Sequence, residues 1–184
     1  MEQHNKILEL SNQVSVVNMN TNNTHNQFNL NFFLNETCKN AINITEFIEN
    51  IDIQMKELEN VGKHGYVTGI SNIILDRLKD MEVSKRPLHC TDLKRETMYI
   101  RNENEWNKDT EEKTTLKQVI GEVAKKNYRK IPEWQNQNPE CKNVMNEQYD
   151  FSVQIMRNSL GDLDDKQIKL DEKIIKNIAK QVTL

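Results

Sequence analysis

The chain has 184 residues, of which 36% are hydrophobic, 6% aromatic and 29% charged, and its formal net charge at pH 7 is −3. That length suits one ordinary domain with extensions and excludes two sizeable enzyme domains. The sequence contains no apolar run of the roughly 18–20 residues that a transmembrane helix needs, no secretory signal at residues 1–5, and only three, widely spaced cysteines. We therefore expect an intracellular protein without membrane contact, disulfide staples or a cysteine-rich zinc fold.

The first predicted element is a short amphipathic helix at residues 3–17. Its apolar residues follow the 3, 4, 3 spacing of a coiled-coil seam: Ile7, Leu10, Val14 and Val17. Because a helix this short is marginal on its own in water, we assign residues 1–20 to a coiled-coil segment that joins copies of the chain into a homo-oligomer. The alternative is a disordered tail.

An asparagine-rich stretch follows and predicts a linker at residues 21–31. Such a tract offers little to bury, and its side chains compete for backbone hydrogen bonds. Toward its end, Phe28, Leu30 and Phe32 alternate with asparagines. This alternation predicts a strand at 28–33 that supplies one edge of a small sheet.

Residues 32–132 are predicted to form a helical domain that contains a β-hairpin. The predicted helices span about 35–42, which Asn35 can cap, and then 44–60, 66–80 and 112–130, where apolar residues recur every three or four positions. Gly62 is expected to end the second helix and Pro132 the fourth. Between the third and fourth helices, β-type residues at 88–91 and 96–101 flank a short polar turn and predict the hairpin.

Residues 133–184 are predicted to form a C-terminal helical extension. It contains one helix from about Met145 to Leu160, ended by Gly161, and a last helix from about Ile168 to Val182. The apolar spacing of the last helix is again similar to a heptad. Taken together, these elements predict an α+β, mainly helical fold with a small three-stranded sheet.

The middle of the chain is basic and its flanks are acidic. Residues 85–101 carry five basic and two acidic side chains, and residues 117–130 carry five basic and one acidic, whereas 46–83 and 133–172 have net charges of −4 and −5. The basic side chains predicted to contact nucleic acid are Lys85, Arg86, Lys94, Arg95, Arg101, Lys125, Lys126, Arg129 and Lys130. The alternative is that they form the solvated faces of helices.

Two successive helices followed by a ribbon with Lys94 and Arg95 at its tip match the plan of a winged helix. In that plan one helix enters the major groove and the ribbon contacts phosphates or the minor groove. Base contacts would come from the start of the helix at 66–80, through Tyr66, Thr68, Ser71 and Asn72. A few phosphate contacts give modest, salt-sensitive affinity, which self-association would raise.

No pattern in the sequence predicts a catalytic residue, a metal or a cofactor. Adjacent His89 and Cys90 point to opposite sides of a strand and lack partners at zinc spacing, and none of the cysteines lies in a nucleophile motif. The stretch 62–69 departs from the order of a phosphate-binding loop. The carboxylates before the helix at 112–130 are expected to cap it rather than bind Mg²⁺; they are Glu103, Glu105, Asp109, Glu111 and Glu112.

Four segments resemble a recurrent region in uncharacterised proteins of giant and other large DNA viruses: FNLNFFLNETCKNA at 28–41, GYVTGISNI at 65–73, RPLHCTDLKRET at 86–97 and IPEW at 131–134. In that family the domain often follows a C2H2 zinc finger and an asparagine-rich coil, which implies a nucleic-acid-associated role. The expected location is the host cytoplasm or viral factory, the nucleus, or the virion. This chain has no finger, because His4 and His25 have no paired cysteines upstream. The resemblance carries over no catalytic residue.

The function predicted on these grounds is non-enzymatic nucleic-acid binding or regulation by a homo-oligomer in a large DNA virus. The alternative is a structural or interaction protein, for example an assembly or scaffold component, that self-associates without binding nucleic acid. A metal-dependent nuclease is the remaining enzyme alternative.

Overall fold

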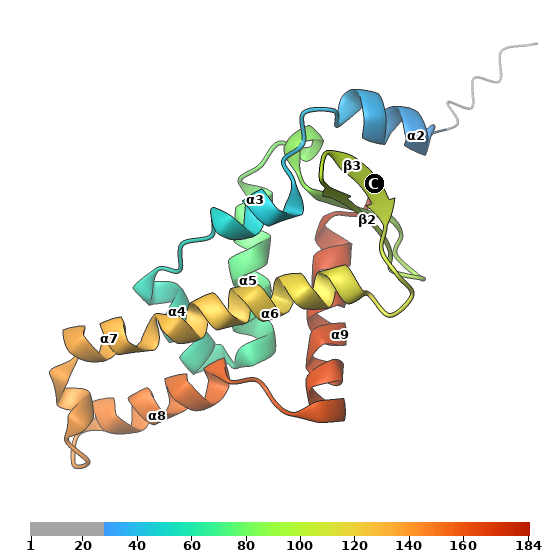
Figure 1. Cartoon of the computed structure of the whole chain (residues 1–184). Helices are drawn as coiled ribbons and strands as arrows, with labels where there is room; N and C mark the ends of the chain where they lie inside the picture. Colours follow the sequence, from blue (N-terminus) through green and yellow to red (C-terminus); the bar gives the residue numbers. More distant parts are fainter. Residues whose placement is uncertain (1–27) are drawn as a thin grey trace, which may run out of the picture. The chain divides into compact units, whose positions relative to one another are not determined.

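The computed structural model describes residues 28–184, and Figure 1 shows the order of their elements. The chain divides into two compact units, Met1–Leu30 and Asn31–Leu184, and the elements below belong to the second unit apart from Leu30. The predicted coiled-coil residues Ile7, Leu10, Val14 and Val17 lie outside the described residues.

The second unit is mainly helical and contains a three-stranded antiparallel sheet, so the α+β prediction is confirmed. Its helical elements are α2 (Leu30–Phe32), η1 (Phe33–Thr37), α3 (Ile44–Glu49), α4 (Met55–His64), α5 (Tyr66–Lys79), η2 (Val83–Lys85), α6 (Thr114–Arg129), α7 (Ile131–Gln137), η3 (Pro139–Lys142), α8 (Glu147–Ser159) and α9 (Asp164–Gln181). Its strands are β1 (Leu88–Asp92), β2 (Thr97–Asn102) and β3 (Glu105–Lys108).

The strand predicted at 28–33 is wrong, because the chain is helical there. Leu30–Phe32 form α2, and Phe33–Thr37 continue it as the π-helical turn η1. The helix expected at about 35–42 is also wrong, because the helical segment ends at Thr37 and the next helix begins at Ile44. Leu34, Cys38 and Ala41 are buried, whereas Phe28 and Phe32 are exposed, so the alternating residues do not form the buried face of a strand.

The helix predicted at 44–60 is divided into α3 and α4 by residues 50–54. A capping box starts α4: the Gln54 backbone N–H donates to Glu57 Oε2 at 2.8 Å. Gly62 lies inside α4, which ends at His64. A Cβ on Gly62 would lie 2.6 Å from Cγ1 of Ile155 in α8, so this glycine permits close packing of two helices instead of ending one.

The predicted hairpin is confirmed as β1 and β2, and a third strand follows it directly. Leu88 pairs with Ile100 and Cys90 with Met98, and these four side chains are buried in the core. β3 pairs with β2 through a two-residue turn whose φ angles are both positive, as in a type I′ hairpin. The third strand therefore lies C-terminal to the hairpin, and the sheet has the order β1-β2-β3.

The helix predicted at 66–80 is confirmed as α5, and it lies at the centre of the core. Most of its apolar residues are buried together with side chains of α6, α9 and the inner face of the sheet. Tyr66 and Ser71 are buried too, and Gln167 and Asn177 of α9 donate hydrogen bonds to their hydroxyl oxygens. The base contacts predicted for these two residues are therefore wrong.

The remaining predicted helices are confirmed as α6, α8 and α9, whereas α7 was not predicted. Pro132 lies in the first turn of α7 and so begins a helix instead of ending one. Trp134 of α7 packs with Leu58 and Ile155 in a second, smaller core. These contacts place the predicted extension, 133–184, within the same compact unit as the preceding helices.

The heptad-like spacing of α9 reflects packing within the chain. Ile175, Ile178 and Val182 belong to the main core. At the end of the helix, the Cys90 backbone N–H donates to the Val182 carbonyl at 2.9 Å, and the Leu184 N–H donates to the Cys90 carbonyl at 3.0 Å. These three residues are thus covered by their own chain, whereas Ile168, at which the predicted helix begins, is exposed.

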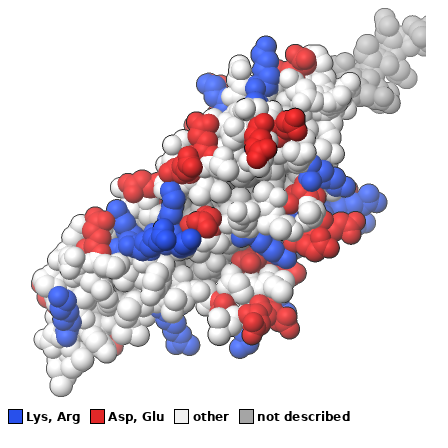
Figure 2. All heavy atoms as spheres, viewed as in Figure 1, with Lys and Arg blue, Asp and Glu red and all other residues white. Residues whose placement is uncertain are grey.

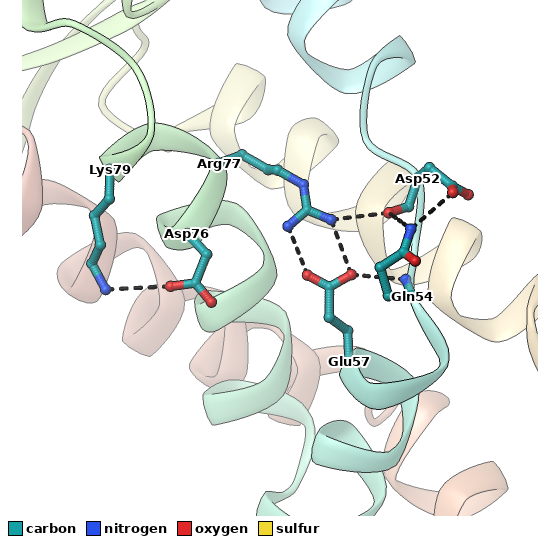
Figure 3. A network of polar contacts seen from close by, with 6 residues as sticks. All are labelled: Asp52, Gln54, Glu57, Asp76, Arg77 and Lys79. Atoms are coloured by element: carbon teal, nitrogen blue, oxygen red, sulfur yellow. Dashed lines mark hydrogen bonds and ion pairs between the residues drawn. The ribbon is translucent and has the colours of Figure 1, made fainter.

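Arg77 links α5 to the start of α4 (Figure 3). Its Nη1 and Nη2 donate to the two carboxylate oxygens of Glu57 at 2.7 and 3.0 Å, and Nη2 also donates to the Asp52 carbonyl at 2.9 Å. Only 28% of the Arg77 side chain and 17% of the Glu57 side chain are exposed. Because Glu57 also accepts the capping hydrogen bond from Gln54, one carboxylate fixes the break before α4 and joins α4 to α5.

We expect Glu57→Ala to lower the free energy of unfolding by about 2 kcal/mol, since it removes a helix cap and a charge-assisted bidentate pair. The matched control is Asp76→Ala, which removes an ion pair to Lys79 at 3.4 Å between side chains that are about half exposed. The control is expected to cost less than about 0.5 kcal/mol. Urea unfolding of both variants measures the two free energies of unfolding. Equal losses of stability would contradict the role assigned to Glu57 as helix cap and partner of Arg77.

Candidate nucleic-acid interface

The turn between β1 and β2 exposes the two cations predicted at its tip. Lys94 and Arg95 are both exposed, and 83% of the Arg95 side chain is accessible. Asp92 shapes the turn, because one of its carboxylate oxygens accepts a hydrogen bond from the Arg95 backbone N–H at 3.0 Å. The other oxygen lies 3.8 Å from Arg95 Nε. An ion pair this long and this exposed is weak, so both cations are available to a ligand.

The cations beside the hairpin differ in accessibility. Arg101 is only 8% exposed, and its Nη1 donates to the carbonyls of Cys38 and Lys39 at 3.0 and 2.6 Å. Arg101 holds the segment after η1 against the outer face of the sheet. Its guanidinium group is therefore not accessible to a nucleic acid. Arg86 is half-buried, and Lys85 is exposed and pairs with a neighbouring glutamate at 3.2 Å.

Lys126 of α6 has a structural role that its sequence position did not indicate. Its Nζ donates to the carbonyls of Glu49 and Ile51, both at 2.9 Å. These carbonyls lie at and just beyond the end of α3, where backbone acceptors lack partners within the helix. Lys126 therefore caps α3 and joins it to α6.

The other cations in this part of α6 are partly neutralised. Lys130 lies 2.8 Å from Glu133 and 3.9 Å from Asp52, and its hydrogen bond to Glu133 raises the pKa of its ammonium group. Lys125 and Arg129 are exposed, and Lys125 pairs with a glutamate one turn earlier at 3.6 Å. Of the four contacts predicted here, Lys125 and Arg129 stay available for an interface.

Basic and acidic side chains are mixed on the face that Figure 2 shows. Blue side chains gather over α6 and at the end of the hairpin, and red side chains lie among them at both places. Such a surface attracts a polyanion only where the local arrangement leaves cations in excess. Binding of a polyanion therefore requires a place where cations from several elements outnumber the carboxylates.

An open groove of about 610 Å³ brings together cations from the hairpin turn, the start of α6 and α9. Its cationic lining residues are Arg95, Lys113, Lys117, Lys169, Lys173 and Lys176. Its acidic lining residues are Glu96, Glu111, Glu112 and Glu172, which leaves an excess of two positive charges. Of the six cations, only Arg95 was predicted as a contact from the sequence.

Asp109 positions the α6 side of this groove. It is 8% exposed and accepts hydrogen bonds from one backbone N–H before α6, at 2.9 Å, and from two in the first turn of α6, at 3.1 and 3.2 Å. The predicted capping role is thus confirmed for Asp109. Because this cap fixes where α6 begins, it also fixes the backbone from which Lys113 and Lys117 reach the groove.

The three lysines that α9 contributes were not predicted as contacts: Lys169 lies in a segment, 133–172, whose net charge is negative, and Lys173 and Lys176 lie just beyond that segment. A signal was nevertheless present: lysines recur at 166, 169, 173, 176 and 180, a 3, 4, 3, 4 spacing that places them on one helix face. A charge summed over a long segment hides such a face, because acidic residues elsewhere in the segment cancel it.

A buried pair, Cys38 and His89, lies near the sheet but is unsuited to catalysis. Cys38 Sγ is 3.6 Å from His89 Nε2, and both residues are 0% exposed. Burial raises the pKa of the Cys38 thiol and lowers the pKa of His89 to about 4. Both groups are therefore neutral near pH 7 and out of reach of a substrate. Over residues 28–184, there is no cluster of three or more His, Cys, Asp or Glu side chains that could hold a metal ion.

Comparison of the chain with models of protein families, with curated proteins and with solved structures gave no match. Among the helices of residues 28–184, none combines the length and the apolar character needed to cross a bilayer. The features of the molecule that bear on its function are therefore the groove and the charges around it.

Proposed function

We propose that this protein binds nucleic acid, without enzymatic turnover, through the cationic groove between the hairpin turn, α6 and α9. The observation that carries the proposal is the convergence of six cationic side chains, from three elements distant in the sequence, on one open groove. A phosphate backbone offers regularly spaced negative charge along such a surface, and the release of its counterions favours binding. Lys94 and Arg95 at the exposed turn extend the cationic surface beyond the groove.

The proposed mode of binding differs from that of a winged helix. There a recognition helix enters the major groove, but α5, which would take that place, is buried along most of its length. Only Thr68 and Asn72 of its predicted base contacts are exposed. Phosphate contacts, which carry no sequence information, therefore account for the proposed binding better than base contacts from α5.

Self-association stays a prediction that would strengthen this function. If residues 1–20 join copies of the chain, each particle carries more than one groove, and binding to one nucleic acid becomes multivalent. A place in a large DNA virus, which the resemblance of residues 28–41, 65–73, 86–97 and 131–134 implies, is a proposal of the same kind.

The proposal is tested by reversing the charges of the hairpin turn. We expect Lys94→Glu/Arg95→Glu to weaken binding to a labelled DNA duplex at least about tenfold near 0.1 M salt, because each lost phosphate contact removes about one released counterion. The matched control is Lys56→Glu/Lys142→Glu, which makes the same change in net charge at two exposed lysines outside the groove. Fluorescence anisotropy gives the dissociation constants.

The control variant separates a local effect from an effect of total charge. Equal losses of DNA affinity in both variants would show only that a more acidic protein binds DNA less well. That result would overturn the assignment of the hairpin turn as a DNA-binding element. Absence of salt-sensitive binding by the unaltered protein would overturn the proposed function itself.

A further inference from the structure

We infer that α9 contacts one phosphate strand of a nucleic-acid duplex independently of base sequence. This inference rests on the proposed function and specifies its substrate class and the element that carries the contact. It depends on three features of α9: a continuous face of lysines, a buried opposite face, and a neighbouring groove without aromatic side chains.

The first feature is a lysine face that extends beyond the groove at both ends. Its members are Lys166, Lys169, Lys173, Lys176 and Lys180, all of which are exposed. Within residues 28–184, none of the five forms an ion pair with a carboxylate. At about 1.5 Å per residue the face is about 21 Å long, and one DNA strand presents a phosphate about every 3.4 Å along its axis. Over that length one strand presents several phosphates, and because the strand winds around the duplex axis, a straight helix face lies alongside only a few of them.

The second feature is that the opposite face of α9 holds the helix in place. Ile174, Ile175, Ile178 and Ala179 are buried in the main core, and backbone hydrogen bonds tie the residues after the helix to β1. The five lysines consequently project from a fixed backbone. A fixed array loses less conformational freedom on binding than five lysines on a loose segment would.

The third feature distinguishes a duplex from a single strand. Proteins that bind single strands stack the bases on aromatic side chains, but no aromatic residue lines the groove, and α9 contains none. Lysine contacts phosphate as a compact point charge and lacks the planar, rigid fork of donors with which arginine binds. A duplex, whose phosphates are ordered without help from the protein, is the ligand that this surface fits.

Glu172 provides an internal test of the geometry. It is exposed on α9 and lines the groove among Lys169, Lys173 and Lys176. If phosphates lie along this face, its carboxylate repels them. We therefore expect Glu172→Gln to bind the duplex several-fold more tightly at low salt, a gain that misfolding could not produce.

The experiment measures binding over a series of salt concentrations. The probes are two labelled duplexes of unrelated sequence and one strand of the first duplex. The test variant is Lys169→Gln/Lys173→Gln/Lys176→Gln, and the matched control is Lys39→Gln/Lys56→Gln/Lys142→Gln, which neutralises three exposed lysines outside the groove. We expect the plot of log K against log salt to become shallower by about 0.9 for each lysine lost from α9, and to keep its slope in the control.

The outcomes separate this inference from the function on which it rests. Equal binding of the two duplexes, weaker binding of the single strand and a shallower slope only in the α9 variant support the inference. If the α9 variant keeps the original slope while Lys94→Glu/Arg95→Glu still weakens binding, the inference is overturned and the proposed function stands. A single strand that binds as tightly as the duplex, or a clear preference for one duplex sequence, also overturns the inference. No binding to any probe overturns both.

Discussion

Lowering the pH from about 7 to about 4 is expected to reduce the free energy of unfolding by about 3 kcal/mol through His89 alone. Burial, together with the nearby charge of Arg86, lowers the pKa of His89 from 6.5 to about 4. The unfolded chain therefore takes up this proton near pH 6.5, and the folded protein only near pH 4. The contribution of His89 is complete above pH 6.5 and is lost, at about 1.4 kcal/mol per pH unit, as the pH falls.

The surroundings of His89 explain why its charged form is disfavoured. The ring lies between Phe33 and Trp106, with centroid distances of 5.2 and 5.4 Å. Its Nε2 contacts the Cys38 thiol, and its buried Nδ1 has no hydrogen-bond partner among residues 28–184. A second N–H on the ring would therefore gain no carboxylate or carbonyl to accept it.

The measurement is urea unfolding of the protein and of His89→Gln between pH 7 and 5, a range in which most carboxylates stay ionised. The variant loses aromatic packing and is less stable at pH 7, but it cannot take up the proton. We expect the difference between the two free energies to shrink by about 2 kcal/mol over this range. Parallel curves would show that His89 titrates normally in the folded protein.

Local sequence signals predicted the elements whose apolar residues recur at a regular spacing along the chain. Helices α5, α6, α8 and α9 each carry an apolar face at helical spacing and are present as expected. The break at residues 50–54 was missed because the apolar spacing continues across it, and because Glu57, which caps α4 locally, is also held by Arg77, twenty residues further along the sequence. The strand β3 was missed because its turn lacks the Asn-Gly or Asp-Gly pair that marks most two-residue hairpins.

In the candidate site, too, the features set by local sequence were predicted and those set by distant residues were not. Lys94 and Arg95 lie at a polar turn between two strands, and that position alone predicted their exposure. Arg101 has the same charge, but its burial depends on carbonyls more than sixty residues away in the segment after η1. The groove could not be predicted either, because it forms only when the turn after β1, the start of α6 and the middle of α9 come together.

Replacing Gly69 with alanine is expected to destabilise the protein by about 3 kcal/mol, even though alanine is the better helix former. Gly69 lies in α5 where the helix crosses α4. A Cβ at this position would lie 2.6 Å from the Cα of Val61 and 2.9 Å from its Cβ. Because the obstacle is backbone rather than the end of a flexible side chain, the two helices must move apart, and the core between them loses contact.

The matched control is Gly121→Ala in α6, where an added Cβ meets no atom within 4 Å. There alanine brings only its helical preference and is expected to stabilise the protein by about 0.5–1 kcal/mol. The two substitutions are chemically identical, so opposite signs in urea unfolding can come only from the surroundings of each glycine. A stabilising Gly69→Ala would mean that α4 and α5 lie farther apart than the Val61 contact requires. The positions of Tyr66 and Arg77, which depend on the packing of α5 and which place them beside Gln167 and Glu57, would then also be wrong.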